Sequence, residues 1–281
     1  MKNRIYLIIS MFLAAALVLT GCSGGGEAAS GELTFKQAFE RPGVHVWYDV
    51  VSPSDGRLAK VRSAFVVEDG KVTVYDATNI DDNIPNALGT LEDYCDLSEE
   101  EAAALVREKY RSGYEAYYAL LEDNMAYYKD LLEEYSNWDE AEEQMKALQE
   151  THDALTGQPM PEKEPQSFSF AMELDQTGNE AAAEGIHAIE QYDRQYEGHI
   201  DNTKEGHKLY SVVEGQEIDM YFPVQTPLKN IEVYDTWYGG YSADYYELFG
   251  RSEIHCMITK CEEDTVFTLD PAGTEGIEII N

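Results

Sequence analysis

The chain has 281 residues, and its 54 Asp and Glu outnumber its 20 Lys and Arg, which gives a net charge of −34. With so few basic residues it cannot neutralise a phosphate backbone or form a polybasic membrane patch, so we exclude nucleic acid as a partner. Hydrophobic residues make up 43% of the chain, which is enough for a buried core in one large domain or two small ones.

Residues 1–21 have the layout of a secretory signal peptide. Lys2 and Arg4 form a short positive segment, and residues 5–19 are apolar except for Ser10. This run is shorter than the roughly 20 residues that a comfortable membrane span needs. We therefore expect residues 1–21 to be removed during secretion.

The sequence Leu-Thr-Gly-Cys at residues 19–22 resembles the lipobox of bacterial lipoproteins. The resemblance implies cleavage after Gly21 and acyl chains on the thiol of Cys22, with the lipid bilayer as a partner. The alternative is an ordinary secretory signal followed by a chance cysteine. Residues 22–32 are rich in glycine and would form a flexible tether. Cleavage removes two basic residues and no acid, so the net charge becomes −36 and the acyl chains must hold the protein against anionic lipid.

The first β-rich part follows the tether. Residues 44–51 and 60–68 are rich in β-branched and aromatic side chains, and a turn-forming sequence separates them. A second turn is expected at Asp69-Gly70, before residues 71–75, because a tight hairpin needs positive φ at both central positions. We predict a meander of three or four strands.

Residues 98–157 are predicted to form a helical hairpin. Ser98 and Glu101 make a capping box at the start, and Asn137 and Glu140 repeat this pattern for a second helix. The first helix carries a Tyr-rich apolar stripe at seven-residue spacing, composed of Tyr114, Tyr118, Leu121, Met125, Tyr128, Leu132 and Tyr135. A two-chain coiled coil has the same repeat, but its stripe is typically rich in Leu.

A second β-rich part follows a proline-rich connector at residues 158–166. Residues 167–174 alternate as a strand, residues 175–179 form a turn, and residues 180–207 have little periodicity. Further strands are expected at residues 208–213, 217–224, 229–235, 254–261 and 264–269. Many short strands bounded by turns predict an α+β fold: an antiparallel β-sheet or sandwich-like body with an inserted helical hairpin, in one domain over residues 33–281.

Three cysteines remain besides Cys22. Cys256 and Cys261 are five residues apart in a predicted strand, so they should lie on opposite faces, too far apart for a disulfide unless the chain turns between them. Three buried thiols are expected, and a disulfide from Cys95 to either partner is left open. A zinc site needs more ligands than these two cysteines and the neighbouring His255 supply.

Residues 234–249 concentrate aromatic side chains around Gly239 and Gly240. Aromatic rings can serve as stacking platforms for ligands and glycans, and glycines let a ligand approach the backbone. We therefore treat Trp237, Tyr238, Tyr241 and Tyr245 as candidate ligand-binding residues. The alternative is a loop whose aromatic side chains fold back onto the sheet.

No catalytic signature is found in the sequence, and no cofactor or metal site is expected. The motifs of serine hydrolases, zinc proteases and nucleotide-binding proteins are missing from it. Two acidic loops, at residues 81–83 and 175–180, hint at calcium, but neither follows the pattern of an EF-hand loop. We interpret both as solvated acidic loops.

Four loose motifs spread over most of the mature chain give a wider resemblance. They lie at residues 68–75, 175–179, 233–240 and 267–277. The chain resembles uncharacterised surface lipoproteins of gut-type Firmicutes, which implies a Gram-positive host and a lipid anchor and adds no mechanism.

These observations favour a lipoprotein on the extracellular face of the cell membrane, acting as a non-catalytic binding module for an extracellular ligand or glycan. The first alternative is a structural protein of envelope assembly that uses the Tyr-rich helices. The second is a hydrolase with an acidic site. Two close carboxylates with raised pKa in a cleft would support the hydrolase.

Overall fold

The computed structural model describes residues 28–51, 53–77, 87–134, 142–143, 145–146, 149, 153, 163–191, 195–201, 207–213, 217–248 and 251–280. Among these residues, no helix is both long enough and apolar enough to span a bilayer. The signal peptide and Cys22 lie outside the described residues, so signal cleavage and lipidation stay predictions.

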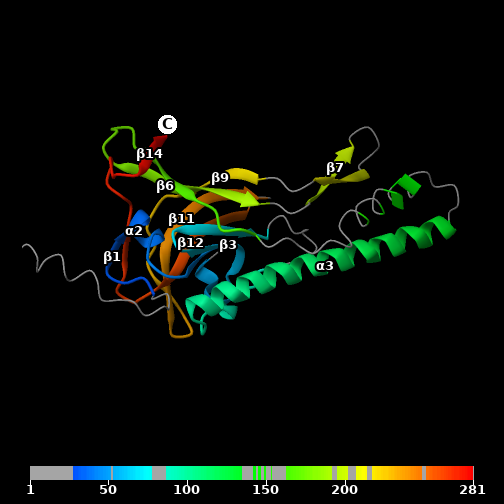
Figure 1. Ribbon diagram of the computed structural model, residues 1–281, viewed down its shortest axis with the longest axis horizontal. Helices are drawn as coiled ribbons and strands as arrows, with labels where there is room; N and C mark the ends of the chain where they lie inside the picture. Colours follow the sequence, from blue (N-terminus) through cyan, green and yellow to red (C-terminus); the bar gives the residue numbers. More distant parts are fainter. Residues whose placement is uncertain are drawn as a thin grey trace, which may run out of the picture.

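A six-stranded antiparallel sheet forms the centre of the molecule (Figure 1). Its strands, in spatial order, are β10 (Ile231–Val233), β11 (Thr236–Leu248), β12 (Arg251–Cys261), β2 (His45–Val51), β3 (Lys60–Glu68) and β4 (Lys71–Asp76). Asp69 and Gly70 connect β3 to β4 with φ of 51° and 71°, so the predicted tight hairpin is confirmed.

A second, four-stranded sheet packs on one face of the first. Its order is β14 (Ile277–Ile280), β5 (Phe168–Leu174), β6 (Ala181–Gln191) and β9 (Glu217–Val224), with only the β14–β5 pair parallel. A parallel pair joins β1 (Glu32–Thr34) to β13 (Val266–Thr268), and a separate hairpin joins β7 (Gln195–Asp201) to β8 (His207–Val213).

The two faces of the central sheet bury different cores, because successive side chains of a strand point to opposite faces. On β2, Val46 and Tyr48 face one core, whereas Trp47 faces the other, between the two sheets. Helix α2 (Phe35–Phe39) adds Phe35 and Phe39 to this second core. Phe39 stacks on Trp47 with ring centroids 5.4 Å apart.

Backbone hydrogen bonds connect the sheets near both edges, which makes the body sandwich-like. Val72 in β4 exchanges two hydrogen bonds of 2.8 Å with Gln166, just before β5. At the other edge, Ser242 in β11 donates to Thr226, and Gln225 donates to Ser242, both at 2.8 Å. The α+β fold class is therefore confirmed.

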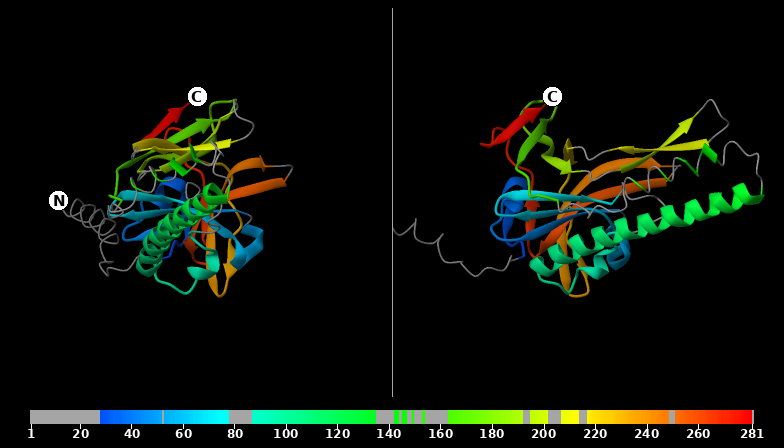
Figure 2. Two further views of the ribbon diagram at one scale, coloured as in Figure 1. Left: turned by 90° about the vertical axis from the view of Figure 1, so that its right-hand side faces the viewer. Right: turned by 45° about the vertical axis from the view of Figure 1, so that its right-hand side comes forward.

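Helix α3 (Glu99–Glu134) covers the opposite face of the central sheet. Ser98 and Glu101 form the predicted capping box, with bonds of 2.8 and 3.2 Å. Among the described side chains, Ala102, Ala103, Val106 and Tyr110 of the helix are buried on the sheet, and farther along Met125 is partly buried against the same core. The helix continues beyond the sheets (Figures 1 and 2). Residues 142–143, 145–146, 149 and 153 are helical, and the remainder of the predicted second helix lies outside the described residues.

Two short 3-10 helices, η1 (Pro53–Leu58) and η2 (Leu91–Asp93), complete the described elements. The three cysteines Cys95, Cys256 and Cys261 are free and buried. Cys256 and Cys261 belong to different cores, as their spacing predicts. Burial raises the pKa of both thiols to about 12.

Two segments differ from expectation. Residues 180–207, which show little periodicity, contain strands β6 and β7. Packing requires the glycine in β6, because a Cβ on Gly185 would lie 2.4 Å from the carbonyl oxygen of Phe222 and 2.5 Å from the ring of Tyr221. The aromatic segment at residues 234–249, most of which lies between two expected strands, is mostly the long strand β11.

Candidate functional site

The four predicted ligand-binding residues all lie on β11, but the three whose side chains are described share no surface. Tyr238 and Tyr241 are fully buried, in the core under α3 and in the core between the sheets, respectively. Tyr241 contacts Phe35 edge-on, with ring centroids 5.3 Å apart. The prediction that Tyr238 and Tyr241 bind a ligand at the surface is therefore wrong. Residues three positions apart on a strand point to opposite faces, and each face of this sheet is covered by a core. The side chain of Tyr245 lies outside the described residues.

The protein itself fills the space beside the two glycines. A Cβ on Gly239 would lie 2.3 Å from Oδ1 of Asn230 and 2.5 Å from the ring of Phe267. A Cβ on Gly240, whose φ is +151°, would lie 2.2 Å from the carbonyl oxygen of Met257. These glycines therefore admit neighbouring protein atoms, where the sequence suggested access for a ligand.

Trp237 is the predicted residue that does reach the surface. It is half-buried and lines a groove of about 480 Å³ formed by the β9–β10 connection, Trp237 of β11, the β12–β13 connection and the start of β13. The apolar wall contains Trp237, Leu228, Val266 and Phe267. Val266 is 52% exposed, so the groove presents apolar surface to solvent. We call this site the Trp237 groove.

The wall of the Trp237 groove is fixed by hydrogen bonds. The side-chain amide of Asn230 donates to the carbonyl oxygens of Glu263 at 3.1 Å and Thr265 at 2.9 Å. The hydroxyl of Thr265 in turn donates to the carbonyl of Ala29 at 2.7 Å. Because these bonds lie within the protein, the groove is formed before any ligand arrives.

The rim of the groove is acidic. Glu263 and Asp264 line it and are exposed, and Glu232 lies directly opposite Trp237 in the β10–β11 register. Lys229 is the one basic residue that lines the groove among the described residues. This site has almost no local signal in the sequence, because Leu228, Trp237 and Phe267 come from segments that only the fold brings together.

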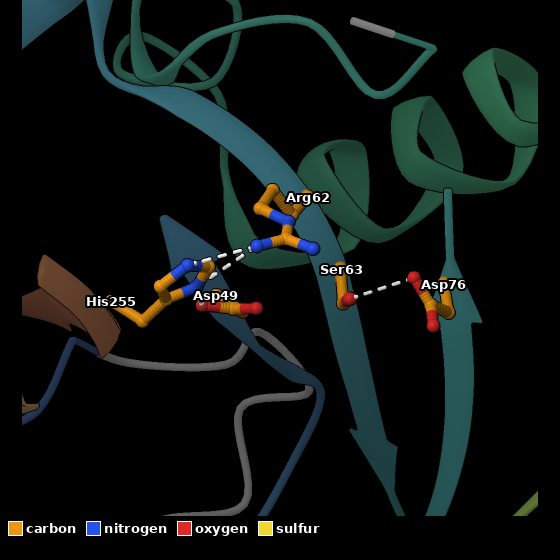
Figure 3. Close-up of polar contacts among 5 residues, drawn as sticks. All are labelled: Asp49, Arg62, Ser63, Asp76 and His255. Atoms are coloured by element: carbon orange, nitrogen blue, oxygen red, sulfur yellow. Dashed lines mark hydrogen bonds and ion pairs between the residues drawn. The ribbon is translucent and has the colours of Figure 1, made fainter. Parts of the chain in front are cut away.

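A polar cluster lies where β2, β3, β4 and β12 run side by side (Figure 3). Arg62 Nη1 donates to Nε2 of His255 at 2.8 Å, and Nδ1 of His255 lies 3.3 Å from Oδ1 of Asp49. Ser63 donates to Asp76 at 3.1 Å. A Ser-His-Asp triad needs the histidine to accept from the serine, whereas here Arg62 fills that position. The arrangement is that of a structural ion cluster.

Two glutamates are buried almost completely. Glu99, in the first turn of α3, accepts a hydrogen bond from the amide of Val46 at 3.0 Å, and burial raises its pKa to about 7 against the opposing effect of Arg41 and Lys260. Burial and the nearby Asp270 raise the pKa of Glu184 to about 8. Glu184 and Asp270 are 1% and 5% exposed, so a substrate has no access to their carboxylates in this conformation.

The acidic loop at residues 175–180 forms hydrogen bonds among its own residues. The carboxylate of Asp175 accepts from the hydroxyl of Thr177 at 2.8 Å and from the amide of Asn179 at 3.2 Å. These bonds, that of Thr177 first, lower the pKa of Asp175. Residues 81–83 lie outside the described residues. Within the described part of the chain, no group of three or more His, Cys, Asp or Glu is arranged to hold a metal.

In comparisons with known proteins, no family model, curated protein or solved structure matches this chain.

Proposed function

We propose that the protein is a membrane-anchored extracellular lipoprotein that acts as a non-catalytic binding module, with the Trp237 groove as its binding surface. The anchor is supported by the lipobox-like sequence that ends at Cys22. Binding is supported by one observation above all: a half-exposed tryptophan lines a preformed groove of about 480 Å³. This volume is within the usual range for small-ligand sites, about 300–1,000 Å³.

A glycan array probed with the mature chain, residues 22–281, tests this function. We expect binding to a subset of glycans, and we expect Trp237→Ala to remove it, because a surface aromatic anchor often contributes over 1–2 kcal/mol to binding. Tyr127→Ala is the matched control, since Tyr127 is an exposed aromatic residue on α3, far along the chain from the groove. Equal binding by parent and Trp237→Ala would contradict the assignment to this groove.

A role in envelope assembly is the second candidate. It is favoured by the extension of α3 beyond the sheets, with Tyr127 59% exposed. A photo-crosslinking residue placed at position 127 or at position 266 separates the two functions in cells. Crosslinks to an envelope protein from position 127 alone support assembly, whereas crosslinks from position 266 alone support binding at the groove.

A further inference from the structure

We propose that the Trp237 groove selects small organic cations, that is, ligands that carry a protonated amine beside an apolar or sugar face. This inference rests on the proposed function and names the ligand class for the same site. It follows from three features of the groove: its aromatic wall, the charges around that wall and its size.

The aromatic wall provides the first attraction. An ammonium group placed over the face of a tryptophan is drawn by the negative charge of the ring face, and Trp is the best side chain for this contact. Trp237 is half-buried, which fixes the ring, and part of it remains open to the groove. Val266 and Phe267 provide apolar surface for the uncharged part of the ligand.

The rim charges provide the second attraction. Glu232 is the register partner of Trp237, and side chains directly opposite in an antiparallel pair have Cβ atoms about 4.5–5.5 Å apart. Glu263 and Asp264 line the same groove. Lys229 also lines it, is exposed, and carries the opposite charge. Three acids against one base give the groove a net negative charge, which favours a cation and opposes an anionic ligand.

The net charge of the whole protein also attracts cations, over a longer range than the charges of the groove. A net charge of −34 raises the local concentration of cations and lowers that of anions around the surface. This general effect is not specific to the groove, so an experiment has to separate it from the local one. The volume of about 480 Å³ restricts the ligand to a small molecule or to one or two units of a longer chain.

Two disaccharides with the same sugar rings, one with free amines and one with N-acetyl groups, test the proposal. The disaccharide of glucosamine carries amines, and its N-acetylated form is neutral with the same rings. We titrate each into the mature protein by calorimetry, at slightly acidic pH where the amines are protonated. We expect the amine form to bind at least about tenfold more tightly than the acetylated form at low salt, with the difference shrinking as salt screens the charges.

Neutralising substitutions assign the effect to the groove. We expect Glu263→Gln combined with Asp264→Asn to reduce the preference for the amine form several-fold, and Lys229→Gln to increase it. Glu173→Gln combined with Glu180→Gln changes the total charge equally at exposed positions outside the groove and should leave the preference unchanged. Trp237→Ala should weaken binding of the amine form at least about tenfold.

Three results would overturn the inference. The first is equal binding of both disaccharides, which leaves the proposed binding function intact but removes the charge selectivity. The second is an equal loss of the preference for the amine form in the variant with Glu263→Gln and Asp264→Asn and in the variant with Glu173→Gln and Glu180→Gln. That result would assign the preference to the total charge of the protein. The third is no binding of either disaccharide. The glycan array tests the binding function separately, so the failure of one proposal is distinguishable from the failure of the other.

Discussion

The backbone amide of Asp270 donates a hydrogen bond of 2.8 Å to the carboxylate of Glu184, which lies in the middle of the second sheet. The carboxylate of Asp270 in turn accepts from the amide of Lys36 in α2 at 2.8 Å. These two bonds tie the segment after β13 to both the sheet and the helix. Both acids are buried. Burial makes ionisation of Glu184 cost free energy in the folded protein, and this cost depends on pH.

The first prediction concerns this pH dependence. The pKa of Glu184 is about 8 in the folded protein, against an ordinary value of 4.5. The folded state therefore holds the proton more tightly, and stability should fall as the pH rises from about 4.5 to about 8. Glu184→Gln keeps an acceptor for Asp270 and cannot ionise. We expect its free energy of unfolding to fall less over this window, by the order of a few kcal/mol, since one pKa unit corresponds to about 1.4 kcal/mol.

Urea denaturation at about pH 5 and about pH 9 measures this difference. Because other groups titrate equally in both proteins, the parent serves as the control for the variant. Parallel curves for the two proteins would show that Glu184 does not titrate in this range.

A second prediction uses two tyrosines of the same strand. The hydroxyl of Tyr241 donates to the carbonyl of Thr268 at 2.9 Å, so Tyr241→Phe should cost about 1 kcal/mol of unfolding free energy. The hydroxyl of Tyr238 is buried and has no hydrogen-bond partner among the described residues. Tyr238→Phe should therefore leave stability unchanged or raise it slightly. Equal losses in the two variants, measured by urea denaturation, would contradict this assignment.

A third prediction concerns the anchor. Replacing Cys22 with Ala removes the thiol that would carry the acyl chains, so the precursor should stay uncut and unlipidated. Incorporation of a labelled fatty acid and partition into a detergent phase measure the outcome. A Cys22→Ala variant that still matures and enters the detergent phase would show that residues 19–22 are not a lipobox.

The fourth prediction follows from the net charge of −34. Repulsion among surface acids destabilises the compact state, and salt screens it. We expect the melting temperature to rise between low and moderate concentrations of sodium chloride. A melting temperature that is flat or falls over this range would show that the surface acids are compensated by neighbouring cations.

The elements with a strong local signal could be predicted from the sequence. The β3–β4 hairpin has a turn whose two residues adopt the positive φ that Asp-Gly favours, and α3 begins at a capping box. Strand β6 has no such signal, and the one glycine inside it, Gly185, is required by the approach of the neighbouring strand β9. That requirement comes from tertiary packing, which a local sequence window does not contain.

The site could be predicted only in part, for a similar reason. An aromatic-rich segment was recognisable, but the register of β11 decides which rings are buried, and it turns Trp237 and Tyr238 to opposite faces. Composition alone gives both residues the same role. Identifying the groove also required knowing that the β12–β13 connection lies beside Trp237, which is a long-range contact.

The pairing of Ala29 with Cys261 determines where the groove would be held in the cell. The amide of Ala29 donates to Lys260 at 3.1 Å and its carbonyl accepts from Glu262 at 2.7 Å, so Ala29 lies beside the end of β12, next to the strand that carries Trp237. Ala29 is seven positions after Cys22 in the sequence, and seven residue steps span at most about 25 Å. A lipid on Cys22 would thus confine the groove to the thin layer of the envelope that borders the bilayer, where it meets molecules fixed in that layer at far higher local concentration than molecules free in the medium.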